Sequence, residues 1–92
     1  MNFEFTPNAW EDFLYWLDED ADMAEKIKEL LKAIRKDPFK GIGKPEPLKF
    51  GLNGYWSRRI NGEHRLVYTV MGQKGKDQKC IILQCRFHYD IG

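Results

Sequence analysis

Five polar side chains in the second half of the chain are of the types that could cleave RNA without a metal ion. They are a carboxylate, two guanidinium groups, an imidazole and a phenol, at Glu46, Arg59, Arg65, His88 and Tyr89. In such a reaction the ribose 2′-OH attacks the adjacent phosphate, so a base must take the 2′ proton and an acid must protonate the departing 5′ oxygen. Cations must also stabilise the negative charge that develops on phosphorus. We therefore assign Glu46 as the candidate base, His88 as the candidate acid and the two arginines as charge stabilisers.

Three side chains could hold the RNA beside these groups. Lys44 and Lys49 lie within three residues of Glu46, where they could bind flanking phosphates. Tyr89 could stack on a nucleobase or donate a hydrogen bond to the phosphate. Pro45 and Pro47 flank the carboxylate and restrict the backbone on both sides, which suits a side chain that must keep a fixed position.

Each of these residues also has an ordinary structural explanation. A loop carboxylate such as Glu46 is commonly just solvated, and Arg58 and Arg59 could pair with acids of a helix. His64 lies next to a turn and could be structural or exposed, and His88 could be a surface histidine. The hypothesis of an RNA-cleaving site therefore depends on the combination and not on any single residue.

The length, the cysteines and the hydropathy limit the class of protein. Ninety-two residues form one domain, spanning 1–92, because two separate cores would not fit. No segment approaches the roughly 20 apolar residues of a membrane span, so we expect a cytoplasmic protein. Cys80 and Cys85 would lie roughly 17 Å apart on a strand, too far for a disulfide. No paired Cys/His spacing is present, so neither a metal site nor a cofactor is expected.

The net charge of +1 hides an uneven distribution of charge along the chain. Residues 1–39 carry five cations and ten acids, a net charge of −5, whereas residues 40–65 carry six cations and two acids, a net charge of +4. Residues 66–92 add four cations and two acids, a net charge of +2. A basic half joined to an acidic half suits an anionic ligand such as RNA, although solvated lysines on a sheet edge are a common alternative.

The hydrophobic periodicity predicts two helices and four strands. Apolar residues at helical spacing predict helices around 10–17 and 23–34, and Thr6-Pro7 is a helix start signal. Alternating patterns predict strands over 2–5, 55–60, 63–71 and 80–89, with an ordered loop over 39–53 and a lysine-rich turn over 72–79. The order β-α-α-β-β-β predicts an α+β fold in which two helices pack on one face of an antiparallel sheet.

Two details of the sheet bear on the chemistry. In the strand 80–89 one face is expected to carry Ile81, Leu83, Cys85 and Phe87, and the other Arg86 and His88. At Asn61-Gly62 a two-residue turn would pair Arg59 with His64, whereas a three-residue loop with Gly62 as a bulge would pair Arg59 with Arg65. Because both arginines are assigned to one phosphate, we predict the bulged hairpin.

Four motifs resemble those of the YoeB toxins, which belong to the RelE superfamily of bacterial type II toxin–antitoxin systems. The motifs are Gly43-Lys-Pro-Glu-Pro-Leu-Lys49, Gly54-Tyr-Trp-Ser-Arg-Arg-Ile60, Glu63-His-Arg-Leu-Val-Tyr68 and Cys85-Arg-Phe-His-Tyr89. Trp10-Glu-Asp-Phe-Leu-Tyr-Trp16 in the helical half fits as well. The resemblance covers nearly the whole chain, in order and without large gaps, which makes it far more specific than one motif alone.

The resemblance implies a small RelE-like fold and an mRNA interferase that cuts mRNA in the ribosomal A site and blocks translation. It implies neutralisation by an antitoxin of the YefM/Phd class, a homodimer, and contact with operator DNA only through the antitoxin complex. Site residues carried over by motif are the base Glu46, the acid His88, the transition-state stabiliser Arg65, the phosphate-binding Arg59 and Lys49, and Tyr89, which completes the site.

Other readings of the same scaffold are a ParE-like module that acts by binding protein, or a degenerate toxin kept for antitoxin binding. The presence of the Glu-Arg-His set favours the enzyme. This chain departs from the family pattern in a longer turn over Gly72–Lys79 and in the extension Asp90-Ile-Gly92 after the His-Tyr pair.

Overall fold

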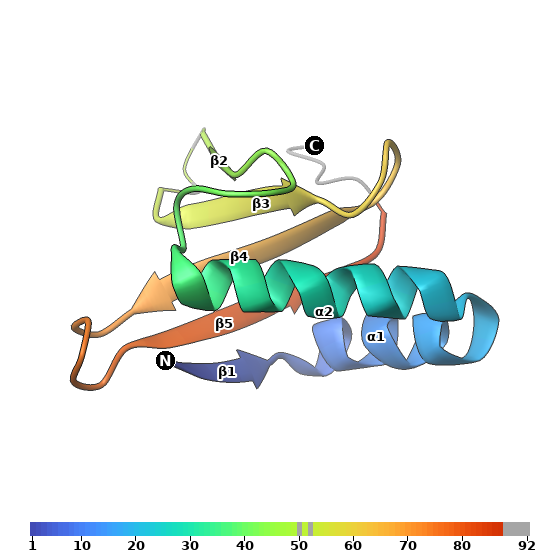
Figure 1. The fold of residues 1–92 in the computed structure, drawn as a ribbon, viewed down its shortest axis with the longest axis horizontal. Helices are drawn as coiled ribbons and strands as arrows, with labels where there is room; N and C mark the ends of the chain where they lie inside the picture. Colours follow the sequence, from blue (N-terminus) through green and yellow to red (C-terminus); the bar gives the residue numbers. More distant parts are fainter. Residues whose placement is uncertain (50, 52, 88–92) are drawn as a thin grey trace.

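Two helices form one layer over one face of a five-stranded sheet (Figure 1). The computed structural model describes residues 1–49, 51 and 53–87. The elements in chain order are β1 (Asn2–Phe5), α1 (Pro7–Glu19), α2 (Ala21–Lys36), β2 (Glu46–Pro47), β3 (Tyr55–Arg59), β4 (Arg65–Met71) and β5 (Lys79–Gln84). The α+β class and the covering of one face by both helices agree with the sequence-based prediction.

The helices begin and end at the residues that local chemistry favours. The Thr6 side chain accepts a hydrogen bond from the Ala9 amide at 3.1 Å, and Pro7 occupies the first helical position of α1. Asp20 caps α2 in the same way, and α2 ends at Lys36, with Asp37 as its C-cap directly before a proline. The apolar stripe of α2 is buried against the sheet, through Met23, Ala24, Ile27, Leu30 and Ile34.

The sheet is mixed, and this corrects the prediction of an antiparallel sheet. The strand order is β1-β5-β4-β3-β2, and β1 pairs with β5 in parallel while the other pairs are antiparallel. Parallel neighbours need a crossover connection, which here begins with the two helices that follow β1. The short strand β2 lies within the segment predicted as a loop, where Glu46 pairs with Ser57. Pro47 is tolerated in it because β2 is an edge strand.

The predicted faces of the last strand are wrong. The fully buried residues of β5 are Cys80 and Ile82, whereas Ile81 and Leu83 are half-buried. The strand also ends at Gln84 instead of continuing toward residue 89. Residues 88 and 89 lie outside the described part of the chain.

A β-bulge at Leu83 explains this error. Tyr68 pairs with Ile82, but its neighbour Val67 pairs with Gln84, so Leu83 is an extra residue without a direct partner in β4. A bulge of this kind shifts the alternation by one residue. As a result Cys85 is fully buried, three residues after Ile82.

The predicted pairing of the β3–β4 hairpin is confirmed. Arg59 pairs with Arg65, and the Ile60 amide donates to the His64 carbonyl at 2.9 Å. The Asn61 side-chain oxygen accepts hydrogen bonds from the amides of Glu63 at 2.8 Å and His64 at 2.7 Å, which orders the loop. The two arginines of the candidate site are therefore cross-strand neighbours.

Arg58 is fully buried between the sheet and the loop that follows α2. It does not pair with a helix acid. Its guanidinium donates instead to the Tyr68 hydroxyl at 3.1 Å and to the carbonyls of Ile42 at 3.0 Å, Asp37 at 2.7 Å and Lys40 at 2.9 Å. Burial raises the pKa of Tyr68, although the Arg58 charge opposes the shift. One buried cation thus fixes the chain that leads toward Glu46.

Candidate active site

The face of the sheet that the helices leave uncovered carries the candidate base and both arginines. Directly paired residues lie on the same face of a sheet, as do residues two apart on one strand. Glu46 pairs with Ser57, and Arg59 lies two residues further along β3 and pairs with Arg65. Arg58, between Ser57 and Arg59, is buried on the other face, beneath the loop that follows α2. Glu46, Arg59 and Arg65 therefore share the opposite, outer face.

The sheet geometry places these charges within reach of one substrate. Glu46 lies two strand spacings from Val67, roughly 10 Å, and Arg65 lies two residues from Val67, roughly 7 Å. The Cα atoms of Glu46 and Arg65 are then about 12 Å apart. A ribose and its phosphate can be contacted from both sides across such a span. Within the described residues none of the three charges forms an ion pair.

Arg65 is held in place by the hairpin. It is half-buried, and its Nη1 donates to the carbonyls of Asn61 at 2.9 Å and His64 at 3.2 Å. In the described part of the chain its Nε and Nη2 have no protein partner. A guanidinium anchored at one nitrogen keeps the others in a fixed fork for an anionic ligand.

The loop before β2 fixes the position of Glu46. Gly43 has a φ of +83°, and its carbonyl accepts a hydrogen bond from the Arg59 amide at 2.7 Å. A Cβ at this position would lie 2.8 Å from a methyl group of Leu30, so the loop approaches α2 more closely than a side chain would allow. Lys44 also has a positive φ, of +51°. The backbone is thus fixed two residues before the carboxylate.

The remaining predicted site residues divide into two groups. Lys44 precedes β2 and Lys49 follows it in the sequence. Both are exposed, as a group that binds phosphate must be. The candidate acid His88 and the phenol Tyr89 lie outside the described residues, so their assignment stays a prediction.

Cys85 and Arg86, shortly before His88 in the sequence, each contact helix α1. The Cys85 amide donates to Asp12 at 3.0 Å, and its carbonyl accepts from the Trp16 indole at 2.8 Å. The Arg86 guanidinium lies over the ring of Tyr15, 3.4 Å from its centroid. Helix α1 therefore holds the end of the described chain against the sheet.

His64, expected from the sequence to be a structural or exposed residue, lies next to the candidate site residue Arg65. Its side chain is 12% exposed, its Nδ1 accepts a hydrogen bond from the Phe87 amide at 2.7 Å, and its ring packs edge-on against Trp16. The sequence feature that could have pointed to His64 is its position in Glu63-His-Arg65, directly before a candidate site arginine.

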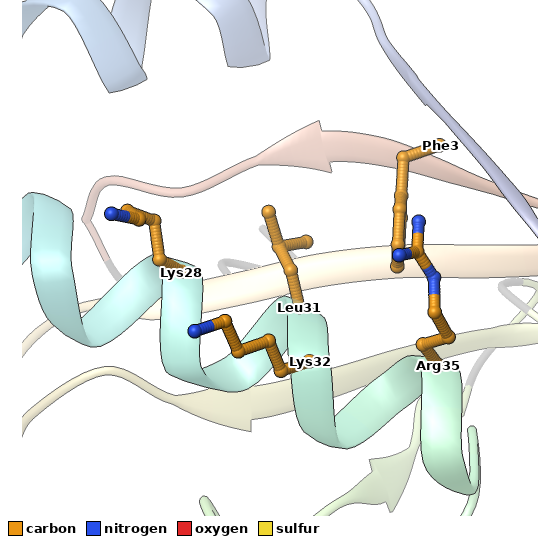
Figure 2. A pocket seen from close by; sticks show the side chains of 5 residues that line it. All are labelled: Phe3, Lys28, Leu31, Lys32 and Arg35. Carbon is orange, nitrogen blue, oxygen red and sulfur yellow. The ribbon is translucent and has the colours of Figure 1, made fainter.

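A second cationic feature lies at the opposite edge of the sheet. A shallow groove between β1 and α2 has Phe3 and Leu31 as its apolar lining and Lys28, Lys32 and Arg35 as its cations. Figure 2 shows the three cationic side chains on successive turns of α2, with Phe3 beside Arg35. The groove belongs to residues 1–39, which carry a net charge of −5. The net charge of that segment therefore gave no indication of a cationic groove. Strands β1 and β2 are the two edges of the sheet, which separates the groove from Glu46.

The described residues contain neither a cluster of metal ligands nor a membrane-spanning helix. In that part of the chain no group of three or more His, Cys, Asp or Glu side chains could hold a metal ion. None of the helices there is long and apolar enough to cross a membrane.

The fold places the chain in a known structural class. The RelBE2 toxin–antitoxin complex of Mycobacterium tuberculosis contains a chain that matches 95% of this one with a TM-score of 0.70 at 20% sequence identity, covering 96% of its own length. A likeness at that identity establishes the fold alone. The layer of two helices over a mixed sheet is thus a RelE-like fold.

The family follows from stronger matches. Residues 5–89 match the YoeB-like toxins of bacterial type II toxin–antitoxin systems. The toxin YoeB of Synechocystis is 53% identical over 89 residues, which is 97% of this chain and 98% of that relative. The solved YoeB/ParE toxin from Agrobacterium tumefaciens has a TM-score of 0.91 at 48% identity and covers 97% of this chain and 100% of its own. This chain belongs to the YoeB toxin family.

Two solved relatives from Staphylococcus aureus are assemblies. A YoeB dimer matches with a TM-score of 0.86 at 50% identity, and a YoeB–YefM complex with a TM-score of 0.84 at 49% identity. Each match covers 97% of this chain and 98% of the relative.

Proposed function

We propose that this toxin is a ribosome-dependent endoribonuclease that cuts mRNA in the ribosomal A site by metal-free acid–base catalysis. The 2′-OH of the A-site message attacks its own phosphate, and translation stops because the message is cut. The observation that carries the proposal is the strand pairing that gathers Glu46, Arg59 and Arg65 on the one uncovered face of the sheet.

The roles follow from the chemistry of the side chains. Glu46 takes the 2′ proton, as an exposed carboxylate on a fixed backbone can. The hairpin holds Arg65 beside the phosphate, where its free N–H groups stabilise the charge of the transition state. The exposed Arg59 binds the same phosphate from the next strand.

The other predicted groups complete the proposed site. His88 protonates the leaving 5′ oxygen, and Tyr89 stacks on a base or donates to the phosphate. Lys44 and Lys49 bind flanking phosphates, which adds affinity for RNA without sequence preference.

The family supplies the proposed partners. A YefM/Phd-type antitoxin neutralises the toxin, as the Staphylococcus aureus complex suggests, and the free toxin is a homodimer in the cytoplasm. Operator DNA is reached only through the antitoxin complex.

The test is primer extension on a defined mRNA in a cell-free translation reaction, with and without ribosomes. Wild-type protein should give a cut within the A-site codon only when ribosomes are present. Glu46→Gln and His88→Gln should each lower the cleavage rate by about 100-fold or more. Glu29→Gln, a change of an exposed helix carboxylate, is the matched control and should cleave like wild type.

Three results would argue against the proposal. Intact mRNA with translation unaffected would favour a degenerate toxin. Growth arrest that survives both substitutions would favour a ParE-like module that acts by binding. A cut that is equally fast without ribosomes would reject the A site as the place of cleavage.

A further inference from the structure

His64 lies where helix α1 meets the β3–β4 hairpin. Its ring packs edge-on against Trp16 of α1, with centroids 4.8 Å apart. Its backbone carbonyl accepts a hydrogen bond from Ile60 across the hairpin, and its neighbour Arg65 begins β4. This side chain is therefore fixed by both the helical layer and the hairpin.

Both ring nitrogens of His64 have partners. Nδ1 is 2.7 Å from the Phe87 amide nitrogen, and Nε2 is 3.2 Å from a carboxylate oxygen of Glu63. A backbone amide can only donate, so Nδ1 is the acceptor and the ring proton is on Nε2, directed at Glu63. A histidine engaged in this way is not poised to exchange protons with a substrate.

Phe87 is held at both ends of its backbone. Its amide donates to His64, and its carbonyl accepts a hydrogen bond from the Arg65 amide at 3.0 Å. Its φ is +68°, which a phenylalanine adopts only where the surroundings impose it. The Phe87 side chain is mostly exposed, so core packing does not explain this conformation.

We propose that His64 is a positioning residue that locks the Phe87 backbone and thereby fixes where the chain enters the segment that carries His88. This inference rests on the proposed function, since it assigns His64 to the placement of the acid. The Phe87 carbonyl also accepts a hydrogen bond from the Arg65 amide, so the residue that His64 holds is tied to the proposed transition-state stabiliser as well. His88 is the next residue in the sequence.

Two substitutions separate the acceptor from the ring. His64→Phe keeps an aromatic ring against Trp16 but cannot accept the Phe87 hydrogen bond. His64→Asn loses the ring but places an amide oxygen close to where Nδ1 lies, so it can accept. Urea unfolding of both variants checks that they fold.

The measurements are amide hydrogen exchange at Phe87 and the kinetics of mRNA cleavage on ribosomes. In His64→Phe we expect Phe87 exchange to be about tenfold faster. In the same variant we expect kcat to fall about 10- to 100-fold, with KM changed less than about twofold, because misplacement of an acid affects the chemical step. His64→Asn should recover most of both losses.

Every other pattern overturns the inference. Unchanged amide exchange at Phe87 in His64→Phe would show that the hydrogen bond to His64 does not hold the Phe87 backbone. Faster amide exchange at Phe87 with an undiminished kcat in His64→Phe would show that the hydrogen bond to His64 does not contribute to catalysis. Protected Phe87 with low kcat in His64→Asn would show that His64 acts by proton transfer. Wild-type protein that protects Phe87 but cuts no RNA would refute the proposed function, and the catalytic role of His64 with it.

Discussion

Replacing Arg58 by lysine should destabilise the protein by about 3 to 5 kcal/mol. The guanidinium is fully buried and donates four hydrogen bonds in different directions, to the carbonyls of Asp37, Lys40 and Ile42 and to the Tyr68 hydroxyl. An ammonium group has three donors on one atom and cannot span this set. At least two bonds would be lost, and each hydrogen bond to a charged group contributes about 1.5 to 3 kcal/mol.

Arg59→Lys is the matched control. Arg59 is the next residue on the same strand, but it is exposed on the outer face. The same change of chemistry should alter the free energy of unfolding by less than about 0.5 kcal/mol there. A comparison of the two variants therefore isolates the effect of burial and of the hydrogen-bond set.

The assay is urea unfolding followed by tryptophan fluorescence and far-UV circular dichroism. A domain of this size has a total stability of roughly 5 to 15 kcal/mol, so the loss at Arg58 should move the midpoint strongly while the m-value stays constant. If the two lysine variants unfold within about 1 kcal/mol of each other, the account of the buried arginine is wrong.

Three further predictions follow from the fold. Gly43→Ala should cost about 2 kcal/mol in urea unfolding, because φ is +83° and the new methyl would lie 2.8 Å from Leu30; a variant as stable as wild type would contradict this. Burial raises the pKa of Cys80 and Cys85 to about 12, so neither thiol should react with Ellman's reagent at pH 8 unless urea is added. Burial also raises the pKa of Asp12 above 3.8, even though the Cys85 amide hydrogen bond opposes the shift. The folded protein therefore holds this proton more tightly than the unfolded chain, and wild-type stability falls as pH rises from 3.8 through the folded pKa. Asp12→Asn should consequently gain stability relative to wild type between about pH 3 and pH 7, and a relative loss over that range would refute the sign.

Features that depend on neighbouring residues were predictable from the sequence. Thr6-Pro7 begins α1 because capping and a fixed φ act within one turn. The pairing of Arg59 with Arg65 was also predicted, because the hypothesis that both bind one phosphate places them on one face and only one of the two loop geometries provides that. These arguments need no knowledge of distant parts of the chain.

Features that depend on distant partners were not predictable. The bulge at Leu83 arises from how β5 meets β4, so a strict alternation wrongly placed Cys85 on the same face as Ile81 and Leu83. The parallel pairing of β1 is set by the path of the chain through the helices, which leaves no mark in Asn2–Phe5. Arg58 and Arg59 look equivalent in sequence, yet the carbonyls that surround Arg58 come from a loop some twenty residues away.

The contrast between Arg58 and Arg59 explains how so small a sheet can hold a charged site. Strand alternation directs Arg58 into the core, where it fixes the loop that reaches Gly43, and directs Arg59 outward, where its amide holds the Gly43 carbonyl. The loop before Glu46 is thus held by a buried cation, Arg58, and by the backbone of Arg59, the residue proposed to bind phosphate. Cys85 and Phe87, which precede His88 in the sequence, are held by a separate set of contacts, from α1 and from His64. The proposed base and acid therefore depend on independent supports, and within the described residues Glu46, Arg59 and Arg65 form no ion pair that would occupy them.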